Sequence, residues 1–98
     1  MAHFLSKEAE QDLDDIAYYI ANASGSLTIA ERLILSLTAR FSLLARHPRL
    51  GRQRDALRPG ARSFPVGNYI IVYAIAGTDV RILRVIHGSR NIAALFGD

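Results

Sequence analysis

The sequence predicts an α+β fold with the element order β-α-α-β-β-β(-α), in which a helix hairpin packs on one face of a small antiparallel-type sheet. Two observations predict this fold. In the first half of the 98-residue chain, apolar residues recur at spacings of three and four, which is typical of amphipathic helices. In the second half, runs of β-branched and aromatic residues alternate with glycine-containing turns, which indicates an antiparallel meander. This order of elements favours a two-layer sandwich of helices and sheet.

The first elements are a short apolar strand, His3-Phe4-Leu5, and a helix expected over residues 7–21. Ser6 is a reasonable N-cap for this helix, and Gly25 ends the segment. The apolar residues follow one helical stripe, so we expect the acidic residues to face solvent: Glu8, Glu10, Asp12, Asp14 and Asp15.

A second, longer helix follows and runs to about Ala45. Thr28-x-x-Glu31 has the pattern of a capping box at its start. Pro48 stops the helix, because a proline disfavours helical geometry at the residue before it. The short connection between the two helices predicts an antiparallel hairpin.

A basic connector over residues 49–60 leads to three predicted strands, residues 62–66, 69–75 and 80–87. Glycine-containing turns of the kind that tight hairpins need separate the strands. Residues 69–75 are apolar on both faces, which predicts that they form the central strand.

In the last strand, strict alternation would place Arg84 on one face with Ile82 and Ile86, and Leu83 and Val85 on the other. Beyond this strand, a short closing helix that packs back is expected from three apolar residues: Ile92, Leu95 and Phe96.

Length and composition set limits on the class of protein. We expect a single domain over residues 1–98, because this length supports one small core. There is no cysteine, so disulfides and thiolate metal sites are excluded. No apolar run approaches the ~18 residues that a membrane span needs. The N-terminal residues turn acidic instead of entering an apolar core, so we expect no signal peptide and a cytoplasmic protein. We expect neither cofactor nor metal, since neither a phosphate-cradling glycine loop nor metal-ligand spacing occurs.

Charge is distributed unevenly along the chain. Residues 1–45 carry three basic and six acidic groups, whereas residues 46–98 carry nine arginines and three acids. Residues 46–62 contain six of these arginines, counting Arg46 and Arg62 themselves. Such a patch attracts an acidic partner or a phosphate backbone, although a solvated loop has the same composition.

Three polar residues occur where a sheet displays side chains. Arg62 begins the first strand of the meander, His87 ends the last, and Arg90 follows it closely. Two guanidiniums and an imidazole can bind phosphate or carboxylate, and in principle assist RNA cleavage. The alternative is structural: the two arginines pair with acids such as Asp55 or Asp98, and His87 caps a strand.

Three segments carry a family resemblance. They are Leu13-x-x-Ile16-x-x-Tyr19-Ile20, Phe41-x-x-Leu44-Ala45-x-x-Pro48-x-x-Gly51-Arg52, and the meander Leu57–Asn91 with its Gly67-Asn68-Tyr69 turn and its final His87-Gly88-Ser89-Arg90-Asn91. In this order, over about four fifths of the chain, they closely resemble ParE-type toxins of the RelE/ParE superfamily of bacterial toxin–antitoxin modules.

The resemblance implies a toxin that inhibits DNA gyrase, and thereby replication, by binding and without chemistry of its own. It also implies a ParD-like antitoxin, with a ribbon-helix-helix DNA-binding half and an acidic, flexible tail, so that DNA is contacted only through the antitoxin. We predict target contacts at Arg90 and Phe96. We predict antitoxin contacts at basic and aromatic side chains: Arg54, Arg58, Arg62, Arg84, Tyr18, Tyr69 and Tyr73.

The same superfamily offers an alternative, a ribosome-dependent messenger endoribonuclease of RelE type that would use Arg62, His87 and Arg90. Many such enzymes carry an arginine directly after the tyrosine of the central strand, where this chain has Ile70. Some end with a catalytic tyrosine, where this chain has Phe96. Phenylalanine neither accepts nor donates a proton, so we expect no catalytic residues. A toxin-fold protein without toxicity is a third possibility.

Overall fold

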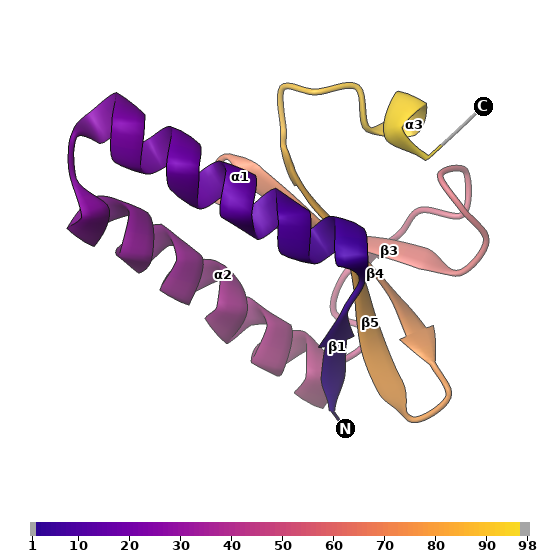
Figure 1. Cartoon of the computed structure of the whole chain (residues 1–98). Helices are drawn as coiled ribbons and strands as arrows, with labels where there is room; N and C mark the ends of the chain where they lie inside the picture. Colours follow the sequence, from indigo (N-terminus) through magenta and orange to yellow (C-terminus); the bar gives the residue numbers. More distant parts are fainter. Residues whose placement is uncertain (1, 97–98) are drawn as a thin grey trace.

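The structure is a computed structural model that describes residues 2–96, and it has the predicted α+β architecture (Figure 1). Two long helices form a hairpin on one face of a five-stranded sheet, and a short third helix follows the last strand. The elements in chain order are β1 (His3–Leu5), α1 (Lys7–Ser24), α2 (Leu27–Arg46), β2 (Arg52–Gln53), β3 (Ala61–Val66), β4 (Tyr69–Ala76), β5 (Asp79–His87) and α3 (Ile92–Leu95).

The sheet has the strand order β1-β5-β4-β3-β2, so β4 is central, as its apolar sequence predicts. Strands β2 to β5 pair antiparallel, whereas β1 pairs in parallel with β5. Sequence analysis missed β2, which lies within the basic connector. Two residues are too few to show an alternating pattern, and only their pairing with Ser63 and Arg62 defines the strand.

The helix boundaries follow from local hydrogen bonds. The Ser6 side chain caps α1 as predicted, accepting a hydrogen bond from the main-chain N–H of Ala9 at 3.0 Å. Gly25 closes α1 with φ of 69°, a left-handed conformation that favours glycine. The predicted capping box at Thr28 is wrong. Ser26 caps α2 instead, because its hydroxyl accepts from the N–H of Ile29 at 3.2 Å and leaves Thr28 inside the first turn.

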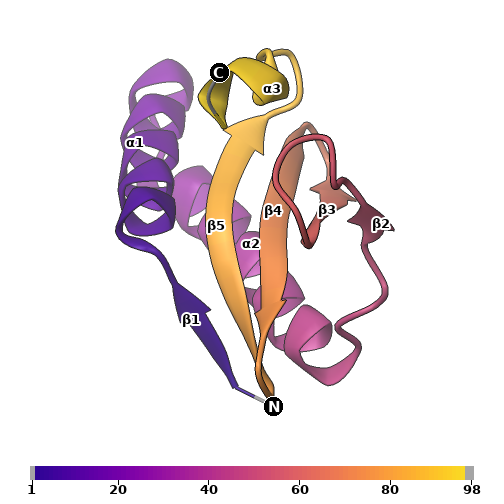
Figure 2. The ribbon, with the colours of Figure 1, turned by 90° about the vertical axis from the view of Figure 1, so that its right-hand side faces the viewer.

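The main hydrophobic core lies between the helix hairpin and the sheet. Its largest fully buried side chains include Leu37, Phe41 and Tyr73. A smaller cluster on the opposite face of the sheet packs beneath α3. Figure 2 shows this layering, with α2 behind the sheet and α3 in front of one end of it. The predicted closing helix is confirmed by this packing.

The side chains of β5 do not alternate strictly between the two faces of the sheet, so the alternation expected there is wrong. Arg84 lies opposite Val72, but Ile82 lies opposite the next residue, Tyr73, which leaves Leu83 as an extra residue in a β-bulge. As a result Ile82 and Val85 both face the main core, while Leu83 turns toward the opposite face.

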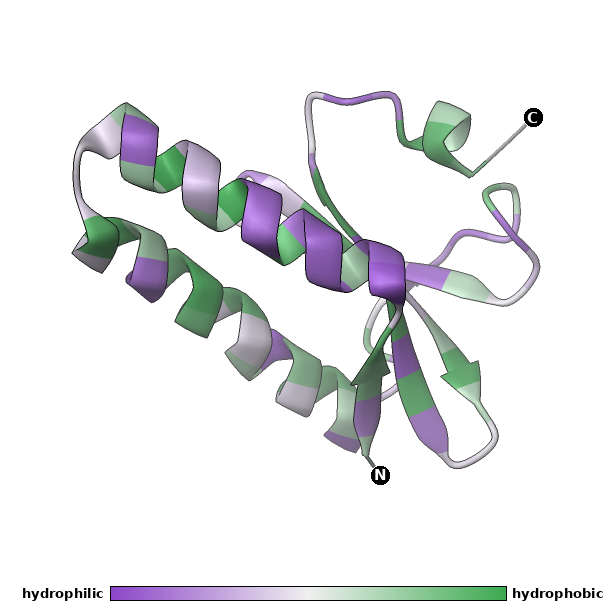
Figure 3. Cartoon of the chain, viewed as in Figure 1, coloured by the Kyte–Doolittle hydropathy of each residue, from purple (hydrophilic) through white to green (hydrophobic). Residues whose placement is uncertain are grey.

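The hydrophilic side chains of the helix hairpin are unevenly distributed. In Figure 3 hydrophilic residues are concentrated in the N-terminal half of α1, where its acids lie. Within residues 2–96, no helix combines the length and the apolar character that crossing a lipid bilayer would require.

Candidate functional site

The basic connector of residues 49–60 is held against the sheet by a buried tyrosine. The Tyr73 hydroxyl donates to the carbonyl oxygen of Pro48 at 2.7 Å and accepts from the N–H of Gly51 at 2.8 Å. A Cβ at position 51 would come within 2.5 Å of this hydroxyl oxygen, so only glycine permits the contact. Burial raises the pKa of Tyr73 above its ordinary value, while the Gly51 hydrogen bond and Arg62 oppose that rise.

Tyr73 is therefore a correction to the predicted antitoxin contacts. Its side chain has no exposed surface, and a partner that binds this conformation finds no atom of it to touch. Tyr69 is also buried, with 8% of its surface exposed, in the main core. Tyr18, in contrast, is 75% exposed on α1.

Two of the arginines predicted as antitoxin contacts, Arg62 and Arg54, form hydrogen bonds inside the protein. The Arg62 Nη1 donates to the carbonyl oxygens of Gly51 at 2.8 Å and Arg49 at 3.3 Å. Arg54 is half-buried, and its Nη1 donates to the Ser63 hydroxyl at 3.4 Å. Of the two acids that the structural alternative named for Arg62 and Arg90, Asp55 accepts from the N–H of Gly60 at 2.9 Å, and Asp98 lies outside the described residues.

Three connector arginines point their surface to solvent: Arg49, Arg52 and Arg58. Only Arg58 among them was predicted as an antitoxin contact. Arg49 and Arg52 belong to the same run of arginines, but the sequence does not show which members of the run are exposed and which, like Arg62, bind the connector.

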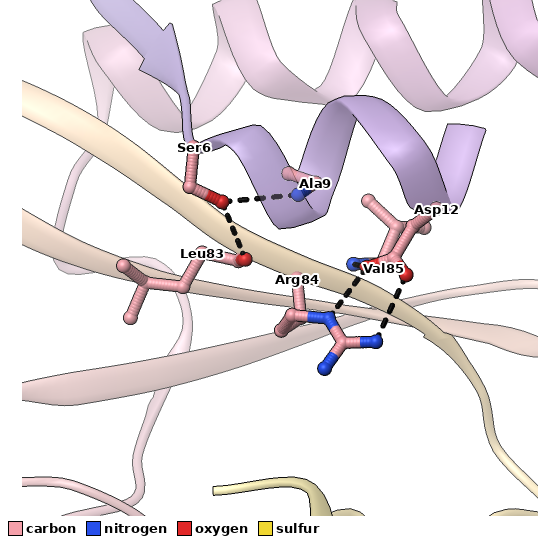
Figure 4. Close-up of polar contacts among 6 residues, drawn as sticks. All are labelled: Ser6, Ala9, Asp12, Leu83, Arg84 and Val85. Carbon is pink, nitrogen blue, oxygen red and sulfur yellow. Dashed lines mark hydrogen bonds and ion pairs between the residues drawn. The ribbon is translucent and has the colours of Figure 1, made fainter. Parts of the chain in front are cut away.

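Arg84, which was predicted as an antitoxin contact, forms an internal ion pair (Figure 4). Its Nε and Nη2 donate to the two carboxylate oxygens of Asp12 at 2.8 and 2.9 Å, and Asp12 also accepts from the N–H of Val85 at 2.9 Å. The hydrogen bond to Asp12 raises the pKa of Arg84, outweighing its burial. The expectation that Asp12 faces solvent is wrong for the same reason.

This ion pair covers an open sheet edge. β1 pairs with β5 only from Val80 to Ile82, and α1 lies beside the rest of that strand (Figure 2). The Ser6 hydroxyl donates to the Leu83 carbonyl oxygen at 2.7 Å, and Asp12 accepts from the next unpaired N–H along the strand. Side chains of α1 thus satisfy main-chain groups that a longer β1 would have paired.

The helix hairpin carries an apolar groove that sequence analysis did not predict. The groove has a volume of about 590 Å³ and includes Tyr18 of α1 with Leu27 and Leu35 of α2, both mostly exposed. Leu27 and Leu35 are eight residues apart, which places them on one side of α2, away from its buried stripe. That second apolar stripe is the signal that could have revealed the groove.

A second hollow lies between the helix hairpin and the end of the sheet, where Tyr69 pairs with His87. It includes Arg40 of α2 with His87 and Arg90. Phe96, the other predicted target contact, packs on the opposite face of the sheet beneath α3, so the structure does not bring it together with Arg90.

The three groups of the ribonuclease alternative are not gathered into one site. Arg62 pairs with Tyr73 and His87 with Tyr69, so they lie four positions apart along β4 and on different neighbouring strands. Four positions correspond to about 13 Å at roughly 3.3 Å per residue. His87 and Arg90 share the hollow, but Arg62 points elsewhere, to the connector.

A neighbouring residue determines which ring nitrogen of His87 accepts a hydrogen bond. The main-chain N–H of Ser89 donates to Nδ1 at 3.1 Å, and the Ser89 hydroxyl oxygen lies 2.7 Å from the same nitrogen. Since an amide N–H can only donate, Nδ1 is the acceptor, and the tautomer that allows this contact has its hydrogen on Nε2. The ring therefore offers a hydrogen-bond donor at Nε2. Within residues 2–96, no three His, Asp or Glu side chains are grouped so that they could hold a metal ion.

Comparison with a solved structure agrees with this fold. A chain of a structure titled "Chromosomal ParDE TA system from P. aeruginosa" superposes with a TM-score of 0.77 at 20% sequence identity, covering 89% of this chain and 95% of that one. The two chains thus share one fold.

Sequence relatives identify the family. Residues 4–92 match the family described as "ParE toxin of type II toxin-antitoxin system, parDE". The chain is 37% identical to Toxin ParE3 of Caulobacter vibrioides over 88% of this chain and 85% of that protein. It is 36% identical to Toxin ParE1 of the same organism over 95% of each. The chain belongs to the ParE toxin family of type II toxin–antitoxin systems, and the predicted resemblance is confirmed.

Proposed function

We propose that this ParE-family toxin acts by binding DNA gyrase and trapping cleaved DNA, which blocks replication, and that its own side chains perform no chemistry. The observation that carries the second half of this proposal is the dispersal of the candidate catalytic groups. Cleavage of RNA needs a base, an acid and a cation around one phosphate. Arg62 is instead bound to the connector, and His87 presents Nε2 as a donor and not as a base.

The proposed antitoxin partner is ParD-like, with a ribbon-helix-helix domain and an acidic, flexible tail. The solvent-facing arginines of the connector, Arg49, Arg52 and Arg58, support such a partner because they present positive charge on an ordered segment. Arg58 and Tyr18 remain the predicted antitoxin contacts that are exposed, and Arg90 and Phe96 remain the predicted target contacts. Both proposed partners place the protein in the cytoplasm.

The test of the target is a cleavage assay with purified gyrase, plasmid DNA and the purified chain. We expect linear, protein-linked DNA to accumulate in proportion to the amount of toxin. Arg90→Ala should reduce this accumulation by about 10- to 100-fold, since one charge-assisted contact contributes about 1.5–3 kcal/mol. Arg32→Ala, which removes an exposed charge from α2, is the matched control and should behave as the unmodified chain does.

Primer extension on messenger RNA after induced expression tests the alternative. Codon-phased cuts within minutes, with gyrase unaffected, would show a ribonuclease and overturn the proposal. Growth that continues after induction, despite a stable complex with the antitoxin, would identify a toxin-fold protein without toxicity.

A further inference from the structure

A basic cleft lies beside β5, where α3 and the connector approach the strand. Its volume is about 390 Å³, and four segments line it: the start of α1, the connector, β5 and the end of α3. In Figure 2 this face of the sheet is turned toward the viewer, with α3 at one end of β5. We call this hollow the β5 cleft. Its charged lining consists of Glu8, Arg58, Arg81 and Arg84.

The bulge in β5 places two of these arginines on the same face of the sheet. Arg81 lies opposite Ala74, and Arg84 lies opposite Val72. Ala74 and Val72 are two positions apart in β4, so they share a face, and both belong to the cluster beneath α3. Arg81 and Arg84 are three positions apart, so without the extra residue Leu83 they would project from opposite faces. The bulge therefore brings both guanidiniums to one cleft.

The ion pair with Asp12 leaves one nitrogen of Arg84 available to a ligand. Nε and Nη2 bind the carboxylate, whereas Nη1 forms no hydrogen bond within residues 2–96. Figure 4 shows this third nitrogen pointing away from Asp12. In the described part of the chain no buried polar side-chain atom lacks a partner, so Nη1 reaches solvent. Because Arg84 lines the β5 cleft, it offers an oriented donor there.

The positive charge of the cleft comes mainly from Arg58 and Arg81. Both are exposed, and among residues 2–96 neither forms an ion pair. Glu8 is the acid that lines the cleft, and Asp12 offsets the charge of Arg84. The N-cap of α1 also lines the cleft, and the N-terminal end of a helix favours negative charge. Two guanidiniums without a carboxylate, beside a third that supplies a fixed donor, favour a phosphate group.

The rest of the lining suits a nucleic acid strand better than a peptide. Leu95 and Phe96 are half-buried and line the cleft beside the arginines. Single strands bind where an aromatic side chain accompanies a positively charged track, and the charge continues here along the connector at Arg52 and Arg49, which face solvent. A peptide that added a strand would need an open sheet edge. The main chain of β5 is instead satisfied by β1, Ser6 and α1.

We propose that the β5 cleft binds a single strand of DNA, whose phosphate contacts Arg58, Arg81 and Nη1 of Arg84. A base of the same strand lies beside Phe96. The inference rests on the proposed function, because the strand belongs to the DNA that gyrase holds when the toxin traps it in the cleaved form. It adds a direct contact between toxin and DNA, whereas the family resemblance implies contact only through the antitoxin.

The test titrates the purified chain into a fluorescein-labelled single strand of DNA of about 12 nucleotides, and measures the anisotropy at several salt concentrations. Each phosphate contact to a single strand adds about 0.7 to the slope of log affinity against log salt. Arg58→Gln and Arg81→Gln should each lower that slope by about 0.7, and weaken binding by about eightfold at about 0.05 M salt. Phe96→Leu should weaken binding by about fivefold or more without changing the slope.

The matched control is Arg32→Gln, which makes the same charge change on an exposed part of α2 outside the cleft. Its affinity should stay within about twofold of the unmodified chain, with an unchanged slope. Equal slopes for Arg32→Gln, Arg58→Gln and Arg81→Gln would overturn the inference. Tighter binding of an RNA of the same sequence would also overturn it, as would binding of a poly-glutamate peptide in place of the oligonucleotide.

Cross-linking on the unmodified chain keeps the test independent of how well the variants fold. A bromodeoxyuridine oligonucleotide is irradiated with the chain, and the linked peptides are identified by mass spectrometry. We expect adducts in residues 91–96 or 81–84. Adducts confined to α2 would place the strand elsewhere and overturn the inference.

The gyrase cleavage assay separates this inference from the proposed function. Arg81→Gln, whose residue is not a predicted antitoxin contact, should need about eightfold more toxin than the unmodified chain to accumulate the same cleaved DNA at about 0.05 M salt. Equal accumulation by both would leave the gyrase proposal intact and overturn the DNA contact. An unmodified chain that traps no cleaved DNA would overturn the proposed function and, with it, the assignment of the strand to gyrase, even where the oligonucleotide binds.

Discussion

Replacement of Asp12 by alanine should destabilise the protein strongly, because one carboxylate serves three donors. Asp12→Ala removes two hydrogen bonds from Arg84 and one from the Val85 main chain. The side chains of Asp12 and Arg84 are 13% and 21% exposed, so water can replace only part of what is lost. Hydrogen bonds to charged groups contribute about 1.5–3 kcal/mol, and breaking a buried pair costs about 3–5 kcal/mol. Discounting for exposure, we expect a loss of about 2–4 kcal/mol.

Such a loss is large for a chain of this size. Domains of this kind have unfolding free energies of about 5–15 kcal/mol, and each kcal/mol corresponds to roughly 4–8 °C in melting temperature. Asp12→Ala should therefore melt roughly 10–30 °C below the unmodified chain. The measurement is urea and thermal unfolding followed by far-UV circular dichroism, since the chain has no tryptophan to report by fluorescence.

The matched control is Asp14→Ala, which removes the same charge from an exposed position of α1. Its free energy of unfolding should stay within about 0.5 kcal/mol of the unmodified value. A double-mutant cycle with Arg84→Met separates the ion pair from the Val85 contact. Equal stability of Asp12→Ala and Asp14→Ala, or a coupling free energy near zero, would refute this account of the β5 edge.

Three further predictions concern the contact between the connector and the sheet. Tyr73→Phe should lower the free energy of unfolding by about 1–3 kcal/mol in urea titrations, because the buried Gly51 N–H loses its acceptor. Burial raises the pKa of Tyr73 in the folded state, so its contribution to stability is present below pH 10 and is lost as pH rises through the folded pKa. Tyr73→Phe should therefore lose less stability than the unmodified chain on going from about pH 9 to about pH 11. Gly51→Ala should cost about 1–3 kcal/mol, because the added Cβ would lie 2.5 Å from the Tyr73 hydroxyl oxygen and 2.9 Å from the Ser63 carbonyl oxygen. Gly88→Ala, whose Cβ would approach no described atom closer than 3.3 Å, should melt at a higher temperature than Gly51→Ala; the reverse order would contradict the steric argument.

The sequence was sufficient for the elements of the fold because they are repetitive. Spacings of three and four located both long helices, and β-type runs between glycine turns located the meander. The β-bulge at Leu83 was missed, since one extra residue changes the faces of a strand without altering its composition. Strand β2 was missed because its existence depends on a partner strand.

The roles of the site residues were less predictable, because the type of a charged residue does not reveal whether it forms an internal ion pair or faces solvent. Arg84 and Arg58 are equivalent in the sequence. Arg84 is bound by Asp12, 72 residues away, whereas Arg58 is exposed. Burial of Tyr73 and exposure of Tyr18 likewise depend on which face of the sheet or helix meets the core. Long-range packing decides such questions, and local periodicity carries little information about it.

The anchoring of the connector has a consequence for how fast and how tightly a partner can dock. A loop that must order upon association spends part of the interaction energy on lost conformational freedom. Here Tyr73 and Arg62 hold residues 48–51 in place beforehand, so the neighbouring solvent-facing arginines are already positioned. A partner that binds these arginines therefore need not order the main chain of residues 48–51, and the free-energy cost of association is lower by that amount.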